Sequence, residues 1–150
     1  MTIQIRDACA DDCSFIVHAN HAMARETEDK ELDRDRLRAG VQSALSDPDR
    51  ATYLVAELHS APVGTLMVTR EWSDWRNGFF WWIQSVYVAP EARGAGVYAA
   101  MHSAVMERAR DAGDVCGVRL YVDKANARAR RVYEREGMAI CHYDLMEVEL

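Results

Sequence analysis

The chain has 150 residues, 49% of them hydrophobic and 28% charged, which fits one globular domain over residues 1–150 with its own core. Its 18 Lys and Arg against 24 Asp and Glu give a net charge of −6, which opposes a phosphate backbone and argues against nucleic acid as a partner. The sequence shows neither a leader pattern nor an apolar run long enough to span a bilayer, so we expect a cytoplasmic protein with no membrane partner.

The first third of the chain predicts one strand and two helices. Alternating isoleucines in residues 3–5 indicate a strand. Asp11 or Asp12 can cap a helix. A segment of mixed charges, residues 26–38, continues into a second helix that ends before Pro48. The inner face of the first helix is predicted to carry Phe15, Ile16, Ala19 and Met23, and that of the second Leu37, Val41, Ala44 and Leu45.

The middle of the chain predicts three strands. Residues 52–58, 63–69 and 79–88 are rich in β-branched and aromatic side chains, which favour strands. A turn at residues 59–62 joins the first two as a hairpin. The third segment is nearly apolar in its first half, which is typical of a strand inside a sheet.

The last third predicts a helix, a strand, a helix and a final strand. Apolar positions recur at helical spacing over residues 97–112, and residues 118–122 indicate a short strand. Asn126 can cap a helix that ends at Gly137, and residues 138–150 are predicted to form a strand. The expected fold is therefore a single α/β (α+β) domain with a mixed, mostly antiparallel sheet, a central parallel strand pair and flanking helices.

A glycine-containing loop, Arg93-Gly94-Ala95-Gly96, joins a predicted strand to a predicted helix. The first turn of a helix has unpaired N–H groups and a partial positive charge, so it attracts anions. The two glycines let a phosphate approach the backbone closely, and Arg93 adds a cation. This loop is therefore a candidate phosphate site.

One interpretation of the loop is a dinucleotide site. Gly94-x-Gly96-x-x-Ala99 satisfies the pattern G-x-G-x-x-G/A, and Asp123 ends the following predicted strand, where such a fold places its ribose-binding acid. However, residues 90–93 separate the strand from the first glycine, and too little chain remains for the second half of that fold. A P-loop is excluded because no Gly-Lys-Ser/Thr follows.

A second interpretation uses far more of the chain. Arg93-x-x-Gly96 follows the predicted strand, and Asn126-Ala127-Arg128-Ala129 leads to Tyr133 and Gly137. Together with the order of the elements, these motifs make the chain resemble the GNAT superfamily of acyl-CoA-dependent N-acetyltransferases over essentially all 150 residues. The resemblance implies a GNAT-like domain that uses acetyl-CoA as co-substrate. It implies direct transfer, in a ternary complex, to a primary amine of a small molecule, peptide or protein; a catalytically silent acyl-CoA-binding module is the other alternative.

The resemblance also implies residue roles. The backbone of Val86, Tyr87 and Val88 is expected to bind the pantetheine arm. The pyrophosphate is expected on Arg93, Gly94, Ala95, Gly96, Val97 and Tyr98, although Tyr98 stands where the family usually has Gly or Ala. On the last helix Asn126, Arg130 and Tyr133 share one side, and Tyr133 is expected to protonate the departing thiolate of CoA.

The acceptor side has weaker signals. Many relatives carry a Glu in the strand that corresponds to residues 79–88, but this stretch contains no acid, so the general base is unassigned. Tryptophan side chains beside acidic ones can bind a cationic amine through cation–π contacts. Alternatively, the tryptophans form a homodimer interface. The candidate acceptor contacts are Trp72, Asp74, Trp75, Gln84 and Glu28. The 4 cysteines and 5 histidines show no metal-ligand spacing, and no metal is expected.

Overall fold

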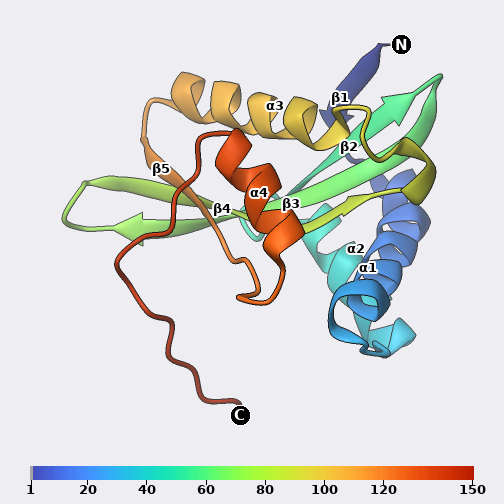
Figure 1. The fold of residues 1–150 in the computed structure, drawn as a ribbon, viewed down its shortest axis with the longest axis horizontal. Helices are drawn as coiled ribbons and strands as arrows, with labels where there is room; N and C mark the ends of the chain where they lie inside the picture. Colours follow the sequence, from blue (N-terminus) through green and yellow to red (C-terminus); the bar gives the residue numbers. More distant parts are fainter. Residues whose placement is uncertain (1) are drawn as a thin grey trace.

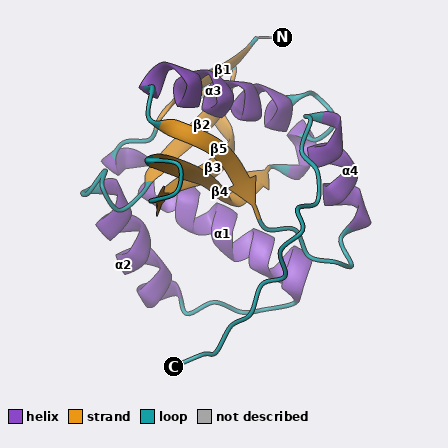
Figure 2. Ribbon diagram, turned by 90° about the vertical axis from the view of Figure 1, so that its left-hand side faces the viewer, coloured by secondary structure: helices purple, strands orange, loops and turns teal. Residues whose placement is uncertain are grey.

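The computed structural model describes residues 2–150, which form a five-stranded sheet of order β1-β2-β3-β4-β5 between two helical layers (Figure 1). Helix α3 lies on one face, and α1 and α2 lie on the other (Figure 2). The elements are β1 (Ile3–Asp7), α1 (Cys13–Glu28), α2 (Arg34–Leu45), β2 (Thr52–Leu58), β3 (Ala61–Ser73), β4 (Gly78–Val88), α3 (Val97–Ala112), β5 (Val115–Leu120) and α4 (Ala127–Arg135), with short 3-10 helices at Ala10–Asp12 and Pro90–Ala92.

The sheet confirms the predicted mixed topology. Strands β1 to β4 are consecutive antiparallel neighbours, and β4 and β5 are parallel because α3 returns the chain to the same end of the sheet. His59 and Ser60 have positive φ angles of 51° and 64°, as two-residue hairpin turns require. A doubly wound parallel sheet is absent from the described residues, so the dinucleotide-fold alternative is wrong.

The main core lies between α3 and the sheet. The apolar stripe predicted for α3 is confirmed, since Val97, Met101 and Val105 are fully buried and pack against Leu54 and Leu66. A second cluster joins α1 and α2 to β2. Its buried members are Cys13, Ile16, Val17, Val41, Ala44, Ala51 and Tyr53. The two clusters pack against opposite faces of the sheet. They therefore fix the positions of the strand ends that frame the candidate active site.

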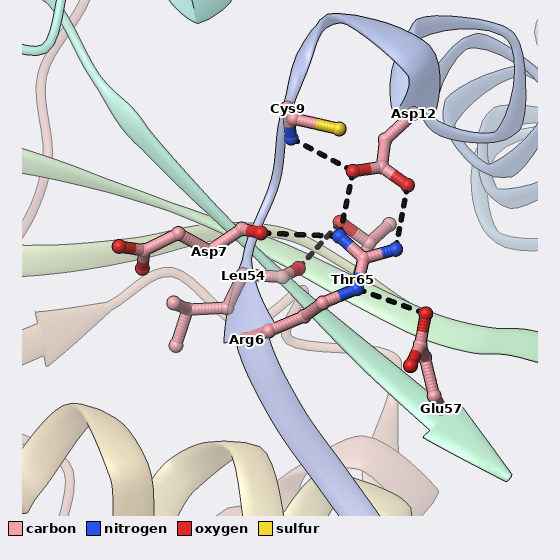
Figure 3. A network of polar contacts seen from close by, with 7 residues as sticks. All are labelled: Arg6, Asp7, Cys9, Asp12, Leu54, Glu57 and Thr65. Atoms are coloured by element: carbon pink, nitrogen blue, oxygen red, sulfur yellow. Dashed lines mark hydrogen bonds and ion pairs between the residues drawn. The ribbon is translucent and has the colours of Figure 1, made fainter. Parts of the chain in front are cut away.

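A polar network ties β1 to the start of α1 (Figure 3). The guanidinium of Arg6 donates to both carboxylate oxygens of Asp12 at 2.8 and 2.9 Å and to Glu57 at 2.8 Å. Asp12 also accepts the backbone N–H of Cys9 at 2.8 Å. These bonds, led by the one from Arg6, lower the pKa of the buried Asp12 carboxyl. Asp12 thus fixes the entry into α1 through its carboxylate rather than through a side-chain cap bond.

The strand predicted over residues 138–150 is wrong: this segment has no helix or strand. A strand needs a neighbour for its backbone N–H and C=O groups, and none of the described strands pairs with the segment. The parallel pair β4–β5 therefore ends the strand order. The last residues extend away from the sheet and helices in both views (Figures 1 and 2).

Candidate active site

Strands β4 and β5 separate halfway along their length. They pair from Phe79 to Ile83 of β4, and the rest of β4 has no partner on that side. At the same level the register between β3 and β4 shifts, with one extra residue on β4, and Ser85 has a φ of 54°. This is a β-bulge, which bends the bulged strand. The bulge is a feature that the sequence pattern did not reveal, and it opens the sheet next to Val86.

A cleft of about 1030 Å³ lies beside the unpaired end of β4. We call it the β4 cleft. It is framed by the end of α1, by β4, by the glycine loop with the start of α3, and by the segment from Asp123 into α4. Its lining residues are Met23, Glu26, Thr27, Val86, Tyr87, Val88, Ala92, Arg93, Gly94, Gly96, Val97, Tyr98, Ala99, Asp123, Ala125, Asn126, Arg128, Ala129, Val132, Tyr133, Arg135 and Glu136.

The glycine loop presents the N-terminus of α3 to this cleft. Gly94 and Gly96 have φ angles of 79° and 82°, and a Cβ on either would meet nothing within 4 Å. The glycines are therefore needed for the left-handed backbone rather than for internal space. Gly96 is the N-cap of α3 and brings no capping side chain, so the first-turn N–H groups remain available to an anion.

Arg93 has a fixed position at the edge of the cleft. Its guanidinium donates to the backbone oxygen of Val88 at 3.0 Å and to the Glu26 carboxylate at 2.7 Å. The pair joins the glycine loop to α1, 67 residues away. Arg93 thus holds three walls of the cleft together. Glu26 lines the cleft, although the sequence favours a solvated surface charge for this acid.

Helix α4 faces the cleft along one stripe. Asn126 caps it by accepting the N–H of Ala129 at 3.0 Å, as predicted. Arg128 and Arg135 line the cleft although the sequence interpretation left them out; their seven-residue spacing is the available signal. Arg130 lies outside the lining, with its buried Nε unpaired among the described residues. Ala95 likewise lies outside the lining.

Tyr133 lies at the inner wall beside Tyr98. The two rings meet edge to face, with centroids 5.3 Å apart, and the Tyr98 hydroxyl is 3.1 Å from His102 Nδ1. Burial raises the pKa of the Tyr133 hydroxyl. It is also the largest cause of the raised pKa of the Tyr98 hydroxyl. Burial lowers the pKa of His102. At neutral pH both phenols keep their protons, and His102 is uncharged.

The acceptor candidates lie in several places, none of them in the lining. Trp72 packs edge-on against Phe79, Asp74 accepts the N–H of Trp75, and Trp75 is 92% exposed. Their hairpin projects from the opposite side of the molecule to α1 (Figure 1).

Gln84 and Glu28, the other two candidates, are close in sequence to residues that line the cleft. Gln84, just before the bulge, donates to Thr69 Oγ1 at 2.6 Å. Glu28 is the exposed last residue of α1 and follows the lining residues Glu26 and Thr27.

Among residues 2–150 no group of three or more His, Cys, Asp or Glu side chains is arranged to hold a metal ion. No helix in the described chain combines the length and the apolar character needed to cross a membrane.

The sequence and the fold match known acetyltransferases. Residues 12–138 match the model of the acetyltransferase (GNAT) family. The thialysine N-epsilon-acetyltransferase of Bos taurus is 31% identical over 160 residues, which cover 98% of this chain and 88% of that protein. The structure of a possible acetyltransferase from Clostridium difficile 630 has a TM-score of 0.93 and 41% identity, covering 100% and 99% of the two chains. A predicted acetyltransferase with acetyl-CoA from Clostridium acetobutylicum shares the fold, at a TM-score of 0.79 and 19% identity over 99% and 96% of the two chains.

Proposed function

Because this chain belongs to the GNAT family of acetyltransferases, we propose that it transfers an acetyl group from acetyl-CoA to a primary amine by direct attack in a ternary complex. The observation that carries the proposal is the β4 cleft, which combines an unpaired strand end, an uncapped helix N-terminus and the half-buried phenol of Tyr133. These three features match the three parts of acetyl-CoA: the amide-containing arm, the pyrophosphate and the thioester.

The cleft residues fit acetyl-CoA in charge and shape. The unpaired edge of Val86 to Val88 offers backbone groups to an extended arm, in the manner of an added strand. The first turn of α3 at Gly96 attracts the pyrophosphate, and Arg128 and Arg135 add positive charge to the lining. Acetyl-CoA supplies the activated acetyl group, and the protein supplies orientation and a proton.

The proposed chemistry uses Tyr133 as general acid. The neutral amine nitrogen attacks the thioester carbon, a C–N bond forms and the C–S bond breaks. The sulfur takes the proton of the Tyr133 hydroxyl. The nitrogen then loses its surplus proton to water, and water returns a proton to the Tyr133 phenolate. Since burial raises the pKa of Tyr133, the phenol carries its proton at neutral pH, as an acid must.

We propose a small cationic molecule as the acceptor. The bovine relative is named for the ε-amine of thialysine, and such an amine arrives largely protonated. Helix α1 ends at the exposed Glu28, which follows the lining residues Glu26 and Thr27; Glu26 is paired with Arg93, so the carboxylate of Glu28 is the one that attracts a cation to this side of the cleft. Peptide amines are the second class to test.

Two measurements test the function together. Calorimetry with acetyl-CoA should show binding, and a thiol-release assay should show free CoA only when an accepted amine is added. The amine panel should contain thialysine, lysine, small polyamines and N-terminal peptides, with mass spectrometry to detect the acetylated product. Binding without product from any amine would indicate the catalytically silent module instead, and absence of binding would reject the assignment of the cleft.

A further inference from the structure

A second cavity lies beside the C-terminal half of α3, whereas the β4 cleft lies at the N-terminus of this helix. We call this cavity the α3 pocket. Its volume is about 250 Å³, and it shares none of its described lining residues with the β4 cleft. It is lined by the loop of residues 48–51, by adjoining parts of β2, β3 and β4, and by Val105 and Arg108 of α3. The α3 pocket is therefore separate from the site of the proposed acetyl transfer.

The inner wall of the α3 pocket is apolar. Leu54, Val68 and Val105 line it and are buried members of the main core. Trp81 packs against the same core and also lines the pocket. An apolar cavity of about 150 Å³ is large enough to hold benzene. The larger α3 pocket therefore has room for one ring and a small polar group.

Arginines surround this apolar wall. Arg50, Arg70 and Arg108 line the pocket together with Asp49. The guanidinium of Arg50 is used elsewhere, because it donates to the backbone oxygen of Ser43 at 3.3 Å and pairs with a carboxylate of α2's C-terminal turn at 3.6 Å. Arg70 is held by Phe79, whose ring centroid lies 5.3 Å from the guanidinium carbon. Arg70 and Arg108 are thus the cations that a ligand in this pocket meets.

The present partners of these two arginines are weakly held. Arg70 pairs with Asp49 at 3.3 Å, and Arg108 pairs with Asp7. The side chains of Asp49 and Asp7 are 94% and 67% exposed, and ion pairs with such exposed carboxylates contribute little to stability. Each carboxylate can therefore turn into water at small cost. A carboxylate inside the pocket is less screened by water and attracts the guanidinium groups more strongly.

We propose that the α3 pocket binds a small carboxylate that carries one apolar ring. The carboxylate accepts two parallel N–H bonds from a guanidinium group, and the ring covers the buried wall beside Trp81. An anion without a ring leaves the apolar wall uncovered, and a neutral ring leaves the arginines unused. Drug-sized ligands occupy cavities of about 300–1,000 Å³, so a pocket of about 250 Å³ selects a smaller molecule than acetyl-CoA.

A nuclear magnetic resonance titration of the full-length protein with benzoate tests the site. The amides of residues 48–54, 68–70 and 105–108 should shift and saturate together, with a dissociation constant of about 1 mM or below. Benzamide has the same ring without the charge, and acetate has the charge without the ring. Each should bind at least about tenfold more weakly than benzoate. The titration needs neither acetyl-CoA nor an amine, so its outcome is independent of the proposed acetyl transfer.

Two pairs of variants test the charges with opposite signs. Arg108→Gln should weaken benzoate binding at least about fivefold. Asp49→Asn should strengthen it at least about twofold, because it removes the acid that competes for Arg70. The controls are Arg110→Gln and Asp111→Asn, which change exposed residues of α3 outside the pocket lining. Each control should change the affinity less than about twofold, because solvent screens exposed charges.

Several results would overturn the proposal. Absence of saturable shifts would reject the α3 pocket as a site, and shifts confined to residues 93–98 would assign benzoate to the glycine loop. Equal affinities for benzoate and benzamide, or for benzoate and acetate, would reject recognition of a ring with a carboxylate. An effect of Arg110→Gln as large as that of Arg108→Gln would reject a specific guanidinium contact. Weaker or unchanged binding by Asp49→Asn would do the same for Arg70, since damage to the fold does not strengthen binding.

Discussion

The rings of Tyr98 and Tyr133 meet at 67° with centroids 5.3 Å apart. Tyr98 of α3 therefore supports Tyr133 of α4, the proposed general acid. Tyr98 is itself held by His102, one turn further along α3. The bulky residue that departs from the family pattern at position 98 therefore has a structural role. It fixes the ring of Tyr133 against the core.

Tyr133→Phe should lower kcat by about 10- to 1,000-fold, because the ring and its packing remain while the transferable proton is lost. The affinity for acetyl-CoA should stay within about threefold of wild type by calorimetry. Steady-state kinetics at saturating amine gives the comparison. An unchanged kcat would leave Tyr133 as a packing residue only.

Tyr98→Phe should have a milder effect than Tyr133→Phe. It removes the bond to His102 and retains the ring contact, so we expect about a two- to tenfold decrease in kcat and a loss of about 1 kcal/mol in unfolding free energy. Denaturant unfolding and kinetics on the same samples separate the two effects. A loss of kcat as large as that of Tyr133→Phe would give Tyr98 a direct part in proton transfer.

Gly96→Asp should reduce the affinity for acetyl-CoA by at least about tenfold, because a carboxylate at the N-terminus of α3 repels the pyrophosphate. The matched control is Gly96→Asn, which has the same shape without the charge. Both residues tolerate the left-handed backbone of this position better than other side chains, and a Cβ there meets nothing within 4 Å. Equal affinities for the two variants would remove the phosphate from this loop.

Glu28→Gln should raise the KM for a cationic amine about two- to fivefold and leave the KM for acetyl-CoA unchanged, since Glu28 ends the helix that lines the cleft. Asp74→Asn removes the same charge from the distant hairpin, and we expect it to have the smaller effect. Kinetics at low and high salt test the electrostatic origin, because salt should reduce the difference. A larger effect of Asp74→Asn would instead assign the acceptor to the tryptophan hairpin.

The Arg6–Asp12 pair should make stability fall with acid. The hydrogen bonds of the pair lower the pKa of Asp12 in the folded protein. The pair therefore contributes fully to the free energy of unfolding above the unfolded-state pKa of about 3.9, and this contribution is lost as the pH falls through the lower folded-state pKa. Asp12→Asn should therefore cost about 1–3 kcal/mol of unfolding free energy at pH 7 and progressively less below about pH 4. Asp11→Asn, at the exposed neighbour, is the control for denaturant unfolding at both pH values.

Local sequence patterns were enough to predict one helix face, one helix cap and one loop of the candidate site. The apolar spacing of Val97, Met101 and Val105 specified the inner face of α3, and Asn126 was found at the cap of α4. The glycines at 94 and 96 marked the left-handed loop. Each of these features depends on residues within a few positions of one another, so periodicity, capping and turn chemistry are enough to predict them.

How these elements meet depends on contacts between residues far apart in the chain. The bulge at Ser85 and the separation of β4 from β5 depend on pairing with β3, and the Glu26–Arg93 pair joins residues 67 positions apart. Residues 138–150 show the same limit: their alternating pattern predicts a strand, but a strand forms only where another strand supplies hydrogen-bond partners. Whether a partner strand is available depends on the assembled sheet and its neighbours. No local sequence pattern contains this information.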